Sequence, residues 1–255
     1  MSALIEVDDL VMRYPTPPSM GGRLALNGVS VSVQPGEFAV ILGANGSGKS
    51  TLLRCIAAML RPSAGSVRVD GQEMTRLRGR ALAKARLALG MIFQHAHLVR
   101  RRSVLANVCC GTLGRHRTLA TALGGLPRQE LSHAQSCLDQ VGLRSFAPQR
   151  AGTLSGGQAQ RVSIARALAQ RPRALLADEP VASLDPEAAE EIMRLLRRVS
   201  HEEGLGVLCV LHQPELARRY ADRILGLRLG KLVFDERPGG VAAGTVGALY
   251  EGLAA

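Results

Sequence analysis

A glycine-rich segment early in the chain has the residues needed to hold phosphate groups. It reads Gly43-Ala-Asn-Gly-Ser-Gly-Lys-Ser-Thr51, and its glycines would let backbone N–H groups approach phosphate oxygens closely. A helix that begins directly after the loop would add the positive end of its dipole. Lys49 would contact the β- and γ-phosphates, and the Ser50 hydroxyl would be a ligand for Mg²⁺. We therefore expect a nucleotide triphosphate to bind here, through Gly43, Asn45, Gly46, Ser47, Gly48, Lys49, Ser50 and Thr51.

Two adjacent carboxylates follow an apolar run later in the chain. Leu175-Leu-Ala177 leads directly into Asp178 and Glu179. By itself this pattern is that of an ordinary strand terminus. After a phosphate loop it favours hydrolysis, because Asp178 at the carboxyl end of a strand can hold the water shell of Mg²⁺. Glu179 can orient or deprotonate the attacking water.

The segment Leu154-Ser-Gly-Gly-Gln158 precedes a predicted helix that continues through Ile164–Leu168. Ser155, Gly156 and Gly157 would present a hydroxyl and free N–H groups at the helix N-terminus, which is the arrangement of an anion site. A chain with one phosphate loop has no obvious need for a second anion site. From these residues alone, a helix cap explains the segment equally well.

The phosphate loop requires a strand before it and a helix after it, and the sequence supplies both. Phe38–Leu42 is nearly all apolar, as expected of a strand buried on both faces, and Ser50–Leu60 has the pattern of a helix stopped by Pro62. Further strands are predicted at 3–13, 29–33, 66–71 (an edge strand), 91–93, 174–177 and 207–211, with a terminal hairpin over 224–234. Residues 103–170 are mainly helical in pattern apart from a basic, glycine-rich interruption at 111–127, and the tail 239–255 receives no assignment.

The composition is that of a globular protein with an excess of positive charge. Hydrophobic residues make up 46% of the 255, and the formal net charge is +11. Such a charge fits nucleic acid, an anionic membrane face or an arginine-rich genomic background. Three tyrosines, four phenylalanines and no tryptophan offer few side chains on which bases could stack. Arg100–Arg102 and the basic residues between 76 and 86 are most simply solvated faces.

The sequence contains no apolar run of the roughly 18 residues needed to span a bilayer, and its start lacks the features of a secretory signal. We therefore expect a cytosolic protein, or one attached to a membrane through a partner. The five cysteines show no C-x-x-C or Cys/His ligand spacing. Reduced and mostly buried thiols are expected, rather than disulfides or a zinc site.

Taken in order, these motifs resemble the ATP-binding cassette family over residues 3–235. The markers are Tyr14, the phosphate loop 43–51, Gln94, Leu154–Gln158, Leu175–Glu179, Ser183-Leu-Asp185 and His212. The resemblance implies an α/β P-loop NTPase fold, with a RecA-like core, an antiparallel β subdomain and a helical subdomain inserted at about 95–170. It also implies that 3–235 form a single ATPase domain, followed by a C-terminal tail at 236–255.

The resemblance further implies a head-to-tail dimer of two copies. Each ATP would lie between the phosphate loop of one copy and the second anion site of the other, which gives that site a purpose. Its residues would be Ser155, Gly156, Gly157 and Gln158. Asp185 would cross the dimer interface and connect the two sites.

The same resemblance gives roles to four more side chains. Tyr14 would stack on the adenine, although a tyrosine at the end of a strand is also an ordinary structural residue. Gln94 would contact Mg²⁺ and the attacking water and would sense the partner subunit. His212, at a strand end, would bond the γ-phosphate, and Glu179 would be the general base. The face of the helical subdomain near Gln94 would receive a short helix from a membrane-spanning partner.

A single cassette without membrane spans resembles the ATPase subunit of an importer assembled from separate chains. Its details are most similar to those of phosphonate-import ATP-binding proteins, at Phe93–Val99, Ser103–Asn107, Gly111–Arg115, Leu176–Pro186 and Leu211–Gln213. That similarity implies transmembrane permease subunits, a solute-binding protein and a peripheral position on the cytoplasmic face of the inner membrane. Uptake of phosphonate or a related oxyanion is then expected, with no nucleic acid. The alternatives are an ATPase subunit for another solute, a subunit of an exporter, and a soluble cassette ATPase that acts on nucleic acid or a metabolic complex.

Overall fold

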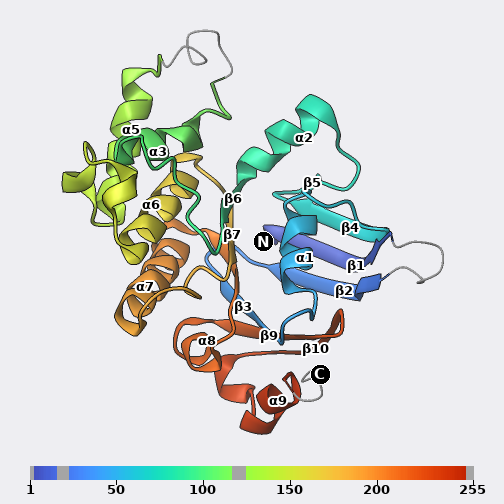
Figure 1. Cartoon of the computed structure of the whole chain (residues 1–255). Coiled ribbons are helices and arrows are strands. Elements are labelled where there is room, and N and C mark those ends of the chain that lie inside the picture. Colours follow the sequence, from blue (N-terminus) through green and yellow to red (C-terminus); the bar gives the residue numbers. More distant parts are fainter. Residues whose placement is uncertain (1–2, 16–22, 117–124, 251–255) are drawn as a thin grey trace.

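The computed structural model of the chain describes residues 3–15, 23–116 and 125–250. Its strands form two sheets, and most of its helices gather on one side of the larger one (Figure 1). In chain order the elements are β1 (Ile5–Tyr14), β2 (Arg23–Val33), β3 (Phe38–Leu42), α1 (Lys49–Ile56), β4 (Ala64–Val69), β5 (Gln72–Glu73), α2 (Gly79–Ala85), β6 (Leu89–Ile92), α3 (Val104–Cys109), α5 (Arg128–Gln140), α6 (Gly156–Ala169), β7 (Ala174–Asp178), α7 (Pro186–Glu203), β8 (Gly206–Val210), α8 (Pro214–Tyr220), β9 (Arg223–Arg228), β10 (Lys231–Glu236) and α9 (Ala243–Ala248).

The larger sheet has the strand order β10-β9-β3-β8-β7-β6, and its strands are parallel except at β10. Every residue of β3 is buried, as its apolar run predicted. Successive side chains of a strand point to opposite faces, so Phe38, Val40 and Leu42 pack into a core with the helices. Ala39 and Ile41 pack into a second core with α1 and the smaller sheet. The sheet is therefore covered on both faces, and the carboxyl ends of its parallel strands remain accessible for a site.

The smaller sheet is antiparallel and has the order β2-β1-β4-β5. The predicted edge strand at 66–71 is corrected here: β4 lies between β1 and the two-residue β5. The predicted helix Ser50–Leu60 is also shorter, since α1 ends at Ile56. Ala58 has a left-handed backbone (φ 53°) that does not continue a helix.

The helices α3, α5 and α6 pack against one another and form the region predicted to be helical. The basic interruption predicted at 111–127 includes 117–124, which lie outside the described residues. Just before that stretch, Arg115 donates to the carbonyls of Gln170 (2.9 Å) and Arg171 (3.0 Å) at the end of α6. The buried carboxylate of Glu130 at the start of α5 accepts from Arg171 and pairs with His116 at 3.0 Å. The described ends of the interruption are therefore attached to α6 and α5.

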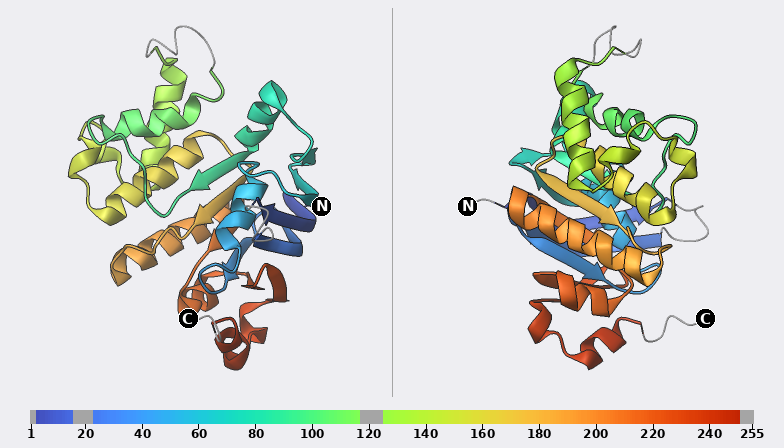
Figure 2. Two further views of the ribbon diagram at one scale, coloured as in Figure 1. Left: turned by 45° about the vertical axis from the view of Figure 1, so that its right-hand side comes forward. Right: turned by 90° about the vertical axis from the view of Figure 1, so that its left-hand side faces the viewer.

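The C-terminal tail, whose structure was not predicted from the sequence, packs on the main core. Val241, Val246 and Leu249 are buried in the cluster that also holds Phe38. The guanidinium of Arg218 in α8 donates to the carbonyl of Val241 at 3.3 Å. Figure 2 shows α9 below the larger sheet, beside α8.

Cysteines and possible membrane spans were also predicted from the sequence. All five cysteines are free thiols, and four are buried, whereas Cys110 is exposed. Among the helices that the structure describes, none is both long enough and apolar enough to cross a bilayer.

Candidate functional site

The glycine-rich loop connects β3 to α1, the strand–loop–helix order that the sequence predicted. Gly48 has φ 108°, and a Cβ at this position would lie 2.5 Å from the carbonyl oxygen of Ala25. At Gly43 a Cβ would lie 2.2 Å from the carbonyl oxygen of Leu227. Both positions therefore require glycine, because any side chain would push the loop away from the backbone beside it.

Lys49 is buried, with 4% of its surface exposed. Its Nζ donates to the carbonyl oxygens of Gly43 (2.7 Å) and Ala44 (2.9 Å), so the lysine closes the loop onto itself. Burial lowers the pKa of Lys49, while the negative charges of Glu179 and Asp178 oppose that shift. Burial removes water from the Lys49 ammonium group, which lies inside the loop. A bound anion would stabilise that charge in place of the water.

The Ser50 hydroxyl donates to Oδ1 of Asp178 at 2.9 Å. Ser50 is the second residue of α1 and Asp178 ends β7, so residues 128 positions apart meet at the carboxyl edge of the larger sheet. Burial raises the pKa of the Asp178 carboxyl, the Ser50 hydrogen bond opposes the rise, and nearby Glu179 adds to it. The pair offers two oxygen donors of the kind that Mg²⁺ prefers.

Glu179 and His212 form a hydrogen-bonded pair, with 2.5 Å between Oε1 of Glu179 and Nε2 of His212. They follow β7 and β8, which are adjacent parallel strands, so their side chains leave the sheet at the same edge. Glu179 has a positive φ of 52°, and its N–H donates to the carbonyl of Val210 at 3.2 Å. This uncommon backbone turns the carboxylate out of the strand line toward the loop.

A hollow of about 300 Å³ lies over the loop and brings together Tyr14 and most of the phosphate-loop residues predicted to bind nucleotide. The phenol oxygen of Tyr14 lies 3.2 Å from the Thr51 hydroxyl. Arg23 and Ala25 also line the hollow, and sequence reasoning missed both. Arg23 pairs with Tyr14 in the β1–β2 register. The lining consists of Tyr14, Arg23, Ala25, Asn45, Gly46, Gly48, Lys49, Ser50, Thr51 and Glu179.

Two other predicted residues differ in their surroundings. Ser47 is fully buried, and its Oγ has no hydrogen-bond partner in the part of the chain that the structure describes. Gln94 is exposed just beyond the end of β6 and is not among the residues lining the loop hollow. The structure therefore places Gln94 at the correct edge of the sheet without bringing it to the loop.

The second predicted anion site forms a separate hollow of about 340 Å³, together with Asp185. Ser155 and Gln158 make a capping box: Ser155 Oγ accepts from the Gln158 N–H (3.3 Å), and the Ser155 N–H donates to Gln158 Oε1 (3.0 Å). Asp185 caps α7 by accepting from the Ala188 N–H at 2.9 Å. The helix-cap interpretation is therefore present in the structure, and the hollow above the caps is lined by Arg161 and by the carboxylates of Asp185, Glu187 and Glu191. Its lining includes Ser155, Gly156, Gly157, Gln158, Arg161 and Asp185.

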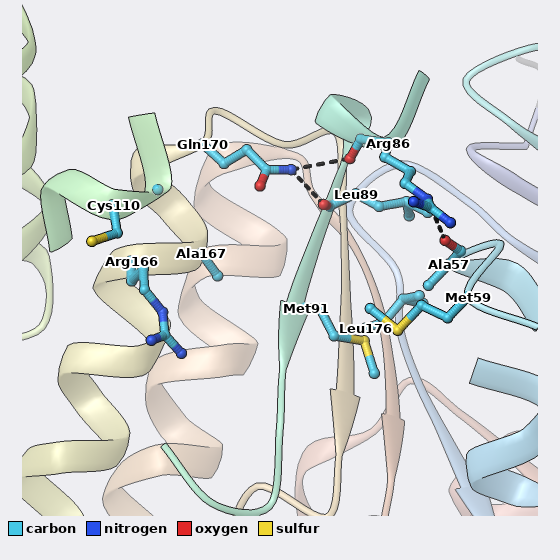
Figure 3. A pocket seen from close by; sticks show the side chains of 11 residues that line it. Ala57, Met59, Arg86, Leu89, Met91, Cys110, Arg166, Ala167, Gln170 and Leu176 are labelled. Carbon is cyan, nitrogen blue, oxygen red and sulfur yellow. Dashed lines mark hydrogen bonds between the residues drawn. The ribbon is translucent and has the colours of Figure 1, made fainter. Parts of the chain in front are cut away.

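A third hollow of about 300 Å³ lies between β6, the end of α1 and the carboxyl half of α6 (Figure 3). Met59, Met91 and Leu176 give it an apolar side, and Arg86 and Arg166 also line it. The amide of Gln170 donates to the carbonyls of Arg86 (3.1 Å) and Leu89 (2.6 Å) at one end. We call this hollow the β6 groove, because β6 runs along it toward Gln94.

Comparison with known proteins agrees with this geometry. The family described as ABC transporter matches residues 26–182. A phosphonates import ATP-binding protein from Frankia casuarinae is 52% identical, over 86% of this chain and 87% of its own length. A phosphite import ATP-binding protein from Stutzerimonas stutzeri is 46% identical, over 98% of this chain and 88% of its own.

Solved structures give the same result. A dimeric ATP-binding cassette in a post-hydrolysis state, bound to ADP and Pi, superposes with a TM-score of 0.80 at 33% identity and covers 93% of this chain and 100% of its own. The ADP conformation of a cassette from an ABC transporter gives 0.84 at 26% identity, covering 99% and 100%. By sequence and by structure, this chain belongs to the ABC transporter family.

Proposed function

We propose that this chain is the ATP-hydrolysing subunit of a membrane importer for phosphonate or a related oxyanion. The observation that carries the proposal is the Glu179–His212 pair at the edge of a hollow that also contains Lys49 and Ser50. That combination would supply a general base, a buried cation and a metal ligand around one phosphate-sized site, which supports the proposal. Membership of the ABC transporter family supports ATP as the nucleotide.

ATP would bind with its phosphates in the loop, where the Lys49 ammonium faces them and α1 adds the positive end of its dipole. The Ser47 hydroxyl, which is buried without a partner among the described residues, would gain one from a phosphate oxygen. Tyr14 would stack on the adenine. Arg23 is the residue of β2 that pairs with Tyr14 of β1, so it would lie next to the stacked base. The Arg23 guanidinium adds a second cation to this hollow.

The oxygens of Ser50 and Asp178 suit Mg²⁺, because both are hard donors and lie 2.9 Å apart. We propose that these two residues hold the ion, with Gln94 reaching it in the nucleotide-bound state. Mg²⁺ when bound would neutralise charge that develops on the phosphate oxygens. The hydrogen bond from the Ser50 hydroxyl to the Asp178 carboxylate keeps the two side chains in place.

Glu179 would act on the water that attacks the γ-phosphate. Its Oε1 is occupied by His212, which fixes the orientation of the carboxylate and leaves Oε2 to accept the proton. His212 could then turn its ring N–H from Glu179 to the γ-phosphate once ATP is present. The hydrogen bond between Glu179 and His212 would then be replaced by two contacts, one from Glu179 to the attacking water and one from His212 to the γ-phosphate.

A second copy of the chain would complete each site. The loop hollow and the Ser155 hollow share none of their lining residues, so we propose that one ATP bridges the loop of one copy and Ser155–Gln158 of the other. Asp185, beside the second hollow, would lie at that interface. The relative solved as a dimer with ADP and Pi supports such an arrangement.

The transported solute is proposed from the relatives, since the solute would be bound by other chains. Two relatives are named for phosphonate and phosphite import. We propose that transmembrane permease subunits dock a short helix in the β6 groove, next to Gln94, with a solute-binding protein on the opposite side of the membrane. The chain would then lie at the cytoplasmic face of the inner membrane.

The test is a tagged Glu179→Gln variant recovered from its native cells in the presence of ATP. The variant should retain ATP, form a trapped dimer and bring a permease with it, whereas Lys49→Ala should bind ATP weakly. Glu202→Gln, at an exposed position, is the matched control for loss of one carboxylate. Normal ATP hydrolysis by Glu179→Gln would refute the assignment of the base. Recovery of ribosomes, nucleic acid or soluble enzymes in place of a permease would refute transport.

A further inference from the structure

The positive charge of the chain is concentrated in one stretch of the sequence. Residues 74–129 contain eleven lysines and arginines and no aspartate or glutamate. The rest of the chain contains 21 basic and 21 acidic residues, so this stretch carries the whole formal net charge of +11. A surface with such an excess of positive charge favours contact with a negative partner, so the position of these residues in the fold matters.

Two of these residues, Arg86 and Arg115, lie beside the carboxyl end of α6, and four others lie on α2 or just before it. Arg115 donates to the carbonyls of Gln170 and Arg171, directly after α6. The Gln170 side chain in turn donates to the carbonyls of Arg86 and Leu89, directly after α2. Figure 1 shows α2 at the same end of the molecule as this end of α6. We call the set the basic rim: Arg76, Arg78, Arg80, Lys84, Arg86 and Arg115.

The charges of the basic rim are not neutralised within the chain. All six residues are exposed. Across residues 3–15, 23–116 and 125–250, no carboxylate forms an ion pair with any of them, whereas neighbouring Arg171 and Arg173 pair with Glu130 and Asp70. Arg80 and Lys84 lie one helical turn apart and so share one outward face of α2, while Ala85 is buried on the other.

Arg100–Arg102 are basic as well but lie elsewhere. The backbone of Gly152 donates to the carbonyl of Arg100, and that of Ala151 to the carbonyl of Arg102, just before α6 begins. The 14 residues of α6 span about 21 Å, so these arginines lie at the opposite end of the helix from the basic rim. Their three charges provide an internal control for the removal of any three charges from the basic rim.

We propose that the basic rim binds the anionic phosphate headgroups of the membrane beside the permease. The inference rests on the proposed function, which places a membrane-embedded partner in the β6 groove. Arg86 lines that groove and α2 borders it, so side chains at this border would face the headgroups that surround the permease. Lysine and arginine near an anionic bilayer each strengthen attachment. The stretch 76–86 contains no aromatic residue, so it offers nucleic acid no stacking surface.

The experiment is a vesicle-binding measurement on the purified chain without permease. Vesicles of phosphatidylcholine with phosphatidylglycerol are compared with vesicles of phosphatidylcholine alone, and the bound fraction is found by sedimentation. We expect binding only to the anionic vesicles, and loss of it when ionic strength rises from about 0.1 M to about 1 M, where the Debye length falls from about 10 Å to about 3 Å. Arg76→Gln, Arg80→Gln and Lys84→Gln combined should weaken binding about a hundredfold, since each basic residue contributes about fivefold.

These three side chains make no hydrogen bond or ion pair with the described residues, so their replacement should leave the fold and ATP hydrolysis in solution unchanged. Arg100→Gln, Arg101→Gln and Arg102→Gln combined remove the same charge and should leave vesicle binding unchanged. Equal binding by the two triple variants, or equal binding to neutral vesicles, would overturn the proposal. So would tighter binding to an RNA or DNA duplex than to the anionic vesicles at equal phosphate concentration. ATP hydrolysis by the same samples tests the proposed function separately, because vesicle binding does not require it.

Discussion

Replacing Leu249 with alanine tests whether α9 is part of the folded core. The Leu249 side chain is 1% exposed and lies in the same hydrophobic cluster as Phe38, Val40 and Leu42 of β3, the strand directly before the phosphate loop. Next to it, the Tyr250 hydroxyl donates to the carbonyl of His212 at 3.4 Å. If α9 unfolds together with the rest of the domain, the loss of this packing must appear in the global stability.

The magnitude follows from the burial. Leu→Ala in a core costs about 2–5 kcal/mol, and because α9 lies at the margin of its cluster, where neighbours can close the gap, we take about 2–3 kcal/mol. In a chain of this size each kcal/mol lowers the melting temperature by about 2–4 °C. We therefore expect the melting temperature to fall by about 5–10 °C, measured by calorimetry or by circular dichroism at 222 nm.

A matched pair of valines provides the control. Val246 is 7% exposed in α9, whereas Val233 is 53% exposed in β10. Val246→Ala should lower the melting temperature and Val233→Ala should not. If Leu249→Ala and Val246→Ala both have the melting temperature of the unaltered protein, α9 unfolds separately at a lower temperature. Our inclusion of the tail in the core would then be wrong.

Two further variants test the loop and the helical region. Gly48→Ala should abolish measurable ATP binding in calorimetric titration, because the new Cβ would lie 2.5 Å from the carbonyl oxygen of Ala25; near-normal affinity would show that the loop tolerates a side chain. Burial alone would raise the pKa of Glu130, but the hydrogen bonds and charges of Arg171 and His116 outweigh it and hold that pKa below its usual value. A lowered carboxyl pKa contributes stability above the unfolded-state pKa and loses it as pH falls through the folded-state value. Glu130→Gln should therefore have a much lower melting temperature than the unaltered protein at neutral pH, and this difference should become smaller in acid. A difference in melting temperature that does not change with pH would contradict the ion-pair explanation.

The elements around the phosphate loop could be predicted from the sequence because their signals are local. The apolar run of β3 and the glycines after it specify strand and loop without reference to the rest of the chain. The position of β4 was predicted wrongly, since an alternating strand has the same pattern whether or not a two-residue partner such as β5 lies beside it. The short, small-residue pattern of α9 carries no periodic signal, and its burial depends on contacts with residues far earlier in the chain.

The candidate site likewise contains residues that local sequence signals predict and residues that depend on distant contacts. Residues in the motifs were found because spacing along the chain fixes their place at a strand end. Arg23 was missed, because its position in the hollow depends on the register between β1 and β2, and an isolated arginine carries no mark of that pairing. Knowledge of that hairpin register would have identified it, as the partner of Tyr14.

The Ser155 hydroxyl has a consequence for which residues this position can accept. Its oxygen accepts from the Gln158 N–H in the capping box, yet the hydroxyl proton stays free to be donated. A serine can therefore hold the helix end and bind an anion at the same moment, with no bond broken in between. Aspartate would cap the helix as well but would bring a negative charge against a triphosphate, and alanine would lose both bonds. Of these three residues, serine alone would let one hydroxyl stabilise the monomer and also bind ATP in the proposed dimer.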